Sequence, residues 1–284
     1  YDTRFAREDI AGATAWLRTN AQPSDLILVD QKYPFGFYYK RYAAEPGDTP
    51  QGPEAAPARY LFVDINTVDA RLGEWAADAR RIYWVQWFES DTDPRHAVPY
   101  LLGQSGEPAG EQLFQGWRIN WWEMAPPNHF ALAPDLAPLN VQFAQAVQTV
   151  EASVPAQVEA GQSIDVALRW QRVANGSVDR PLKARVALYD AHDNRLAQAD
   201  ERLLNDRHVA PAAWSADDRP LNVYQLATSS DSPPLAPGDY ALRLLVYDAE
   251  SLEPLEIIDA AGNPAGIEAA IGTISISSAT TPQP

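Results

Sequence analysis

The spacing of hydrophobic residues changes halfway along the chain, and this change constrains the fold more than any other feature. In residues 1–128, short apolar runs alternate with segments whose apolar residues recur every three or four positions. These patterns are typical of buried parallel strands and amphipathic helices. In residues 141–276, apolar and polar residues alternate, as in Ile164–Trp170, Leu182–Tyr189 and Tyr240–Tyr247. Such alternation is typical of antiparallel sheets packed face to face. The sequence therefore predicts two domains with separate cores.

The first domain, residues 1–128, is predicted to be an α/β, Rossmann-like domain with a mostly parallel sheet. Strands that alternate with helices favour this arrangement. No glycine-rich phosphate loop follows the first strand, where the sequence runs Gln31-Lys32-Tyr33-Pro34-Phe35-Gly36, and this argues against nucleotide binding. The predicted helices span 4–19, 68–80 and 94–104, and the predicted strands span Leu26–Val29, Tyr60–Val63, Ile82–Phe88 and Gln112–Met124.

The second domain, residues 141–276, is predicted to be an all-β, antiparallel, Ig-like sandwich of about seven to nine strands. Residues 129–140, which include Pro134 and Pro138, are predicted to be a proline-rich linker. The tail 277–284, rich in Ser, Thr and Pro, is expected to be disordered.

Charge and cysteine content restrict the possible partners. The net charge of −16 repels nucleic acid and anionic lipid surfaces. The chain has no cysteine, so disulfides, thiolate-bound zinc and thiol catalysis are excluded. No motif indicates a cofactor. Because the chain starts at Tyr1 without a methionine or a signal peptide, we expect it to be a segment of a larger protein.

Three stretches of the second half resemble a sandwich module found in large bacterial membrane proteins. The first joins Val158–Gly161 to the run ending at Trp170. The second is Val186–Asp190 with Asp193 and Arg195, and the third runs from Leu235–Tyr240 to Tyr247 and Asp248. The resemblance implies a β-sandwich and brings no catalytic residue with it.

The first half resembles the soluble C-terminal region that follows the membrane part of polytopic glycosyltransferases of the dolichyl-phosphate-mannose protein mannosyltransferase-like and aminoarabinose transferase-like kind. The matching features are Trp16 on a helix, Gln22–Asp25 before the strand Leu26–Asp30, the aromatic segment Phe35–Tyr42, and Tyr60–Asp64.

This resemblance implies a bacterial parent that transfers sugar from a polyprenyl-phosphate donor outside the cytoplasm. The catalytic acids of that family lie on loops of the membrane part, which this chain does not contain. The chain would then be a non-catalytic accessory region at the extracytoplasmic face, tethered by a transmembrane region outside this sequence. It would position the acceptor or shield the membrane site. Its partners would be the transmembrane portion of its parent and a glycan or polyprenyl-linked sugar.

Two other functions stay open. Tyr83–Phe88 and Trp117–Trp122 place large rings on both faces of two strands, and Trp87 and Trp122 are the candidates for stacking sugar rings in a carbohydrate-binding protein. The structural alternative to sugar binding is that helices cover both faces of the sheet and pack on these rings.

The other possibility is an enzyme with an unfamiliar acidic site. Asp30, Asp64 and Glu89 each follow a predicted parallel strand, and ligands bind at the carboxyl ends of such strands. The structural alternative is that Asp64 caps the next helix and Asp30 closes a turn. No catalytic residue and no metal ligand is assigned, because none of the four histidines pairs with another at metal spacing.

Overall fold

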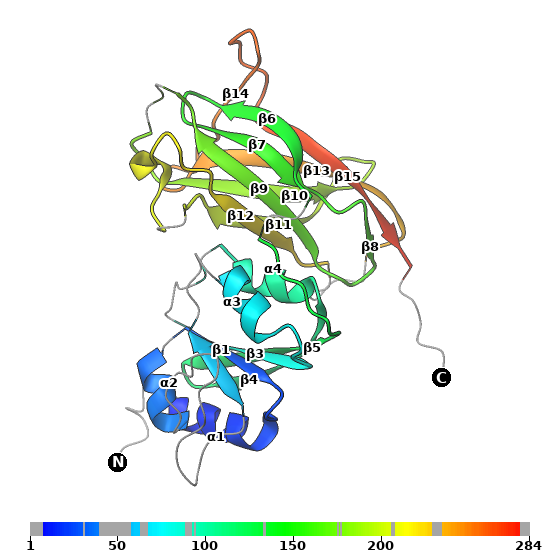
Figure 1. The fold of residues 1–284 in the computed structure, drawn as a ribbon. Coiled ribbons are helices and arrows are strands. Elements are labelled where there is room, and N and C mark those ends of the chain that lie inside the picture. Colours follow the sequence, from blue (N-terminus) through cyan, green and yellow to red (C-terminus); the bar gives the residue numbers. More distant parts are fainter. Residues whose placement is uncertain are drawn as a thin grey trace. The chain divides into compact units, whose positions relative to one another are not determined.

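A computed structural model describes residues 8–30, 32–39, 58–62, 68–88, 93, 95–132, 135–174, 176, 178–205, 208–228 and 235–278. The chain divides into two compact units (Figure 1). The N-terminal unit comprises residues 1–93 and 98–132, and the sandwich unit comprises 94–97 and 133–284. Of the described residues, 46% lie in strands and 15% in helices, so the protein is mostly β.

The N-terminal unit is built on a five-stranded sheet of order β2-β1-β3-β5-β4 in the described residues. Its strands are β1 (Leu26–Val29), β2 (Arg59–Phe62), β3 (Arg81–Trp87), β4 (Gly106–Phe114) and β5 (Trp117–Met124). Its helices are α1 (Ile10–Asn20), α2 (Lys32–Tyr39), α3 (Val68–Trp75) and α4 (Ala97–Gly103).

The prediction of an α/β domain with a mostly parallel sheet in residues 1–128 is wrong. Strand β1 pairs in parallel with β2 and β3, but β5 runs antiparallel to β3, and β4 runs antiparallel to β5. The expected strand Gln112–Met124 is broken by a tight turn at Gln115 and Gly116, where Gly116 has φ 79°. So short a turn can join only antiparallel neighbours, which makes the sheet mixed.

Helices cover both faces of this sheet (Figure 1). Helices α1 and α2 pack on the face that carries Val29, Val85 and Ile119, all of which are buried. The opposite face carries Leu28 and Trp84, which are also buried, and α3 and α4 lie on this side. Beyond β5, the buried Asn128 holds the chain against the unit, because its side-chain amide donates to the carbonyl oxygens of Ala76 and Ala79 at 2.7 and 2.8 Å.

The second unit is a β-sandwich, which confirms that part of the prediction. Its two five-stranded sheets have the orders β11-β10-β13-β15-β8 and β12-β9-β7-β6-β14 in the described residues. The strands are β6 (Ala137–Phe143), β7 (Val147–Ser153), β8 (Gln157–Glu159), β9 (Ile164–Arg172), β10 (Leu182–Tyr189), β11 (Arg195–Arg202), β12 (Leu221–Leu226), β13 (Gly238–Asp248), β14 (Ile257–Ile258) and β15 (Glu268–Ser277), and a short 3-10 helix, η2, spans Pro211–Ala213.

Three details of the sandwich differ from the expectation. The sheets are not wholly antiparallel, because β8 pairs in parallel with β15. Strand β6 begins at Ala137, inside the segment 129–140 that was expected to be a linker. Ser277, expected in the disordered tail, is the last residue of β15 and pairs with Glu159. Residues 279–284 lie outside the described residues.

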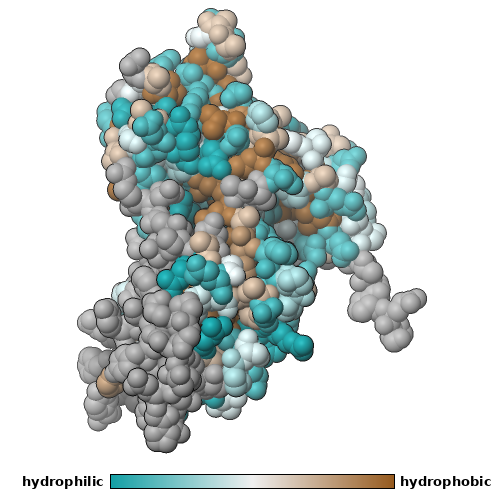
Figure 2. Space-filling view, viewed as in Figure 1, coloured by the Kyte–Doolittle hydropathy of each residue, from teal (hydrophilic) through white to brown (hydrophobic). Residues whose placement is uncertain are grey.

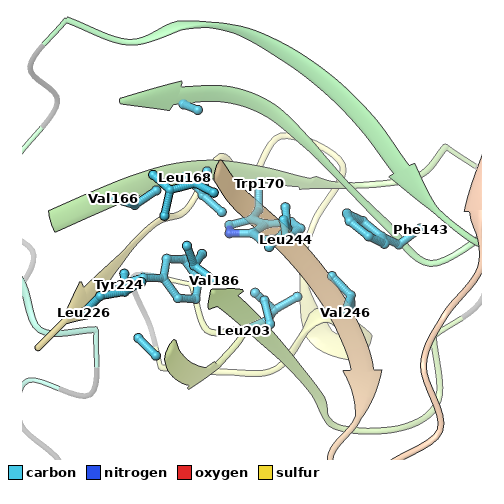
Figure 3. Packing of buried hydrophobic residues seen from close by; sticks show 14 of the residues in the cluster. Phe143, Val166, Leu168, Trp170, Val186, Leu203, Tyr224, Leu226, Leu244 and Val246 are labelled. Atoms are coloured by element: carbon cyan, nitrogen blue, oxygen red, sulfur yellow. The ribbon is translucent and has the colours of Figure 1, made fainter. Parts of the chain in front are cut away.

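The sandwich core forms from the inward-facing residues of the alternating runs. Trp170, Tyr224 and Phe143 are fully buried between the sheets, together with Leu244 and aliphatic neighbours from both sheets (Figure 3). The rings of Phe143 and Trp170 lie 6.2 Å apart. Strict alternation therefore buries one face of each strand and leaves the other face available for polar groups.

The stretches that resemble the bacterial sandwich module form structural parts of this unit. Trp170 lies in the core. Asp190 accepts hydrogen bonds from the backbone N–H groups of His192 and Asn194 at 2.8 and 2.9 Å, which closes the β10–β11 turn. The Tyr240 hydroxyl donates to the carbonyl oxygen of Ala236 at 2.6 Å. These motifs therefore specify hairpins and packing rather than chemistry.

Candidate ligand-binding groove

Two of the residues predicted from the sequence, Asp30 and Trp87, lie together at the carboxyl end of the parallel strands. The backbone N–H of Trp87 donates to Oδ2 of Asp30 at 2.8 Å, and the Asp30 side chain is buried. Asp30 thus satisfies a backbone donor at the end of β3. The other two acids of the predicted acidic site, Asp64 and Glu89, lie outside the described residues, so that site stays a prediction.

The two predicted aromatic residues, Trp87 and Trp122, cannot form one stacking platform. In the register of β3 and β5, Trp87 is opposite Trp117 and Trp122 is opposite Ile82, so the two indoles belong to opposite faces of the sheet. Trp122 is only 6% exposed, and Trp87 is half-buried. The rings of these strands therefore serve mainly as packing between the sheet and its helices.

Charged residues gather at the other end of the N-terminal sheet, where β1 and β3 begin. Nε of Arg81 donates to Glu123 at 2.7 Å, and Nη1 of Arg81 donates to the Tyr83 hydroxyl at 3.2 Å. Burial raises the pKa of the nearby Asp25 carboxyl, although a hydrogen bond from the Gln22 N–H opposes this shift. These contacts brace the start of two strands.

A groove with charged side chains lies on the outer face of the sheet β11-β10-β13-β15 in the sandwich unit. Its volume is about 440 Å³, within the range of small-molecule sites. Its walls combine charged, aromatic and aliphatic side chains. The residues that line it are Arg185, Gln198, Asp200, Leu245, Tyr247, Leu252, Pro254, Ile267 and Glu268.

The floor of the groove is a straight row of residues that face one another across four strands. Asp200 on β11 is opposite Arg185 on β10, Arg185 is opposite Leu245 on β13, and Leu245 is opposite Glu268 on β15. Directly opposite residues share one face of a sheet and lie within contact distance. Strand register therefore places a guanidinium between two carboxylates.

Glu268 is held by its neighbours. Its Oε1 accepts from the Tyr189 hydroxyl at 3.1 Å and from Nη2 of Arg185 at 3.5 Å. The Arg243 guanidinium stacks over the Tyr189 ring at 4.3 Å and lies 3.8 Å from Oε2 of Glu268. The carboxylate is thus fixed in position before any ligand arrives.

Asp200 is fixed in the same way. Its Oδ1 accepts from the Tyr247 hydroxyl at 3.0 Å, and its Oδ2 accepts from the Gln198 amide at 2.7 Å. Burial, followed by the hydrogen bond to the Asp200 carboxylate, raises the pKa of Tyr247 to about 12. Tyr247 therefore remains a neutral hydrogen-bond donor at physiological pH and is unsuited to act as a base.

The raised pKa of Tyr247 gives a prediction for alkaline pH. The difference in tyrosinate absorbance between the wild type and Tyr247→Phe should have a midpoint near pH 12 rather than 10. Since the unfolded chain ionises this tyrosine first, its contribution to stability is present below pH 10 and is lost as the pH rises toward 12. A midpoint near 10 would contradict both the burial of Tyr247 and its hydrogen bond to Asp200.

The arrangement can bind a polar molecule more readily than it can transform one. Each charged side chain described in the groove contacts a second side chain, either in the groove or next to it. Donors and acceptors held in this way can form hydrogen bonds with the hydroxyl groups of a ligand. Among the described residues, no three His, Asp or Glu side chains are arranged to hold a metal ion. The sequence reasoning missed this groove because it followed the apolar face of each strand. The signal was present on the other face, where Arg185 and Tyr247 alternate with core residues.

Comparisons with known proteins leave the family open. No protein-family model and no curated protein matches the chain. Among solved structures, the chain is similar to a CARDB domain from Pyrococcus furiosus, at 13% identity over 48% of this chain and 94% of that one, with a TM-score of 0.27. It is also similar to a β-glucosidase from Listeria innocua, at 13% identity over 48% of this chain and 16% of that one, with a TM-score of 0.25.

A third similarity is to a domain of an outer-membrane lipoprotein from Porphyromonas gingivalis, at 16% identity over 44% of this chain and 93% of that one, with a TM-score of 0.22. The class of the protein rests on its own architecture, which is a mixed-sheet unit joined to a β-sandwich unit (Figure 1). The groove lies on the sandwich unit. Within the described residues, no helix has the length and apolar character needed to cross a bilayer.

Proposed function

We propose that this chain is an extracytoplasmic accessory region of a membrane-bound, glycosyltransferase-like bacterial protein. It positions the sugar acceptor or shields the membrane site and performs no chemistry itself. Its partners are the transmembrane part of its own parent chain and a glycan or polyprenyl-linked sugar. The sequence resemblance of both halves motivates this proposal.

The groove of the sandwich unit is the observation that carries the proposal. Two carboxylates, a guanidinium and a tyrosine with a raised pKa are held by mutual contacts on the outer face of the sheet. Such a set offers donors and acceptors to sugar hydroxyls and keeps Tyr247 protonated. Holding an acceptor needs these properties, whereas acid–base catalysis needs a group whose pKa lies near the working pH.

The two alternative functions have less support in the described residues. A carbohydrate-binding face on the Trp-rich strands needs an exposed pair of rings, yet Trp84 and Trp122 are buried. Trp87 and Trp121 are half-buried and pack against the core of the N-terminal unit. The acidic enzyme site needs carboxylates that face a ligand, whereas Asp30 accepts a hydrogen bond from the backbone of Trp87.

The test uses the parent reading frame. We expect apolar membrane-spanning segments upstream of Tyr1. In membranes that contain the parent protein, deletion of residues 133–278 should raise the KM for the acceptor and leave the KM for the polyprenyl-linked donor unchanged. A reading frame without apolar spans, or sugar transfer unchanged by the deletion, would contradict the proposal.

A further inference from the structure

The groove has an apolar wall whose backbone departs from the ordinary geometry. Leu252 has φ 63°, in the left-handed region that a bulky side chain rarely adopts. Its N–H donates to the carbonyl oxygen of Asp248 at 3.0 Å, the kind of tight turn that usually ends in glycine. Nevertheless, Leu252 is 68% exposed, so the fold accepts backbone strain at a residue that gains little from burial.

This wall is held rigidly beside the polar floor. Oδ1 of Asp248 accepts from the N–H groups of Glu250 and Ser251 at 2.8 and 3.1 Å, and the Asp248 N–H donates to the carbonyl oxygen of Glu253 at 3.0 Å. The strand-like bridge between Tyr247 and Pro254 folds the segment back onto β13. A wall fixed in this way loses little conformational entropy when a ligand binds.

Leu252 lies in the groove with other exposed apolar residues, and together they form its apolar wall. Ile267 is 44% exposed and lines the same groove, as does Pro254. On the face seen in Figure 2, hydrophobic and hydrophilic residues of the sandwich unit lie side by side, so an exposed apolar residue alone is not unusual. In the groove, the apolar wall stands beside an ordered polar floor.

The charge of the lining restricts the ligand. Among the residues that line the groove, one guanidinium, from Arg185, faces two carboxylates, from Asp200 and Glu268. Arg243, outside the lining, lies 3.8 Å from Glu268 and also pairs with Asp193, so carboxylates still outnumber guanidiniums. Together with the net charge of −16 on the whole chain, this disfavours an anionic ligand. A neutral ligand that presents hydroxyls on one side and C–H groups on the other matches both surfaces. Nε of Arg185 is buried and has no hydrogen-bond partner within the described parts of the chain, which leaves a donor unsatisfied in this floor.

We infer that this groove binds a neutral saccharide. The hydroxyl groups of the saccharide contact Arg185, Asp200 and Glu268. The C–H face of its ring packs on Leu252, Pro254 and Ile267. The choice of a sugar rests on the proposed function, and the location and the neutral charge rest on the groove itself. The site uses none of the tryptophans of the N-terminal sheet.

Calorimetric titration of the full chain with a panel of neutral hexose oligosaccharides tests the inference, with the matching uronic-acid oligosaccharides as the charged comparison. Saturable binding of a neutral member is expected. Arg185→Met should weaken it about ten-fold, because a charge-assisted hydrogen bond is lost. Leu252→Gly should weaken it while the melting temperature stays equal or rises, because glycine relieves the left-handed backbone.

Leu113→Ala is the control, because Leu113 is a 53% exposed leucine on β4 of the other unit and its loss should leave sugar binding unchanged. The inference is overturned if no neutral member of the panel binds, if the uronic acids bind more tightly, or if Leu252→Gly binds as the wild type does. Such a result removes the groove as the place where the acceptor is held, whereas the accessory role implied by the sequence resemblance is decided separately by the upstream reading frame and the transfer assay.

Discussion

Replacement of Trp170 by alanine is expected to destabilise the sandwich unit by about 3–5 kcal/mol, the usual cost of removing a large aromatic ring from a core. Trp170 is fully buried in β9 and packs between the two sheets beside Phe143 (Figure 3). The backbone around the indole belongs to a paired central strand, so it can collapse only in part into the space left behind. We expect the N-terminal unit to keep its stability.

Hydrogen exchange followed peptide by peptide can measure this difference between the units. In Trp170→Ala, protection should fall in β7, β9 and β12 and remain in β1 and β3. The matched control is Trp117→Ala, which removes a fully buried indole from the core of the N-terminal unit and should give the opposite pattern. Equal loss of protection in both units would show that the two clusters melt as one cooperative core.

The sandwich could be predicted because its signal is local. Each residue of Ile164–Trp170 that faces the core is separated from the next by one residue that faces outward, and a pleated strand requires this period. Whether two strands pair in parallel or antiparallel depends on the segment that connects them. The prediction of a mostly parallel sheet in the N-terminal unit was wrong for this reason. A single Gly116, at positive φ, converts one expected strand into a hairpin and makes the N-terminal sheet mixed.

Helix α2 shows a second limit of local reasoning. Its sequence, Lys32–Tyr39, contains Pro34 and Gly36, and both residue types have low helix propensity. Nevertheless it is helical, since Phe35 and Tyr39 are fully buried and their rings lie 5.0 and 6.2 Å from that of Tyr60 on β2. Packing against a distant strand outweighs propensity here, and no local pattern contains that information.

The groove could not be predicted for a related reason. Arg185 and Glu268 are 83 residues apart in sequence, and they meet only because β10, β13 and β15 pair in one particular register. Hydrophobic alternation tells which face of a strand is polar, but it does not tell which residues of separate strands lie opposite each other. A shift by one residue would turn Arg185 into the core.

Replacement of Asp30, a residue of the predicted acidic site, is expected to have the second large effect on stability. Asp30→Ala should destabilise the N-terminal unit by about 1–3 kcal/mol, the cost of leaving a partly buried donor without its partner. The donor is the backbone N–H of Trp87, whose hydrogen bond to Oδ2 of Asp30 is 2.8 Å long. Asp30→Asn should lose much less stability, because the asparagine amide oxygen can accept the same hydrogen bond.

Urea unfolding of the two variants separates a structural role from a chemical one. If Asp30 acts only on the backbone of β3, the stability of the N-terminal unit falls in Asp30→Ala and is nearly kept in Asp30→Asn. If the carboxylate instead serves a ligand or a reaction with Asp64 and Glu89, Asp30→Asn removes its charge and abolishes that activity at little cost in stability. Equal stability of the wild type and Asp30→Ala would refute the structural role, because the contact with Trp87 would then contribute nothing.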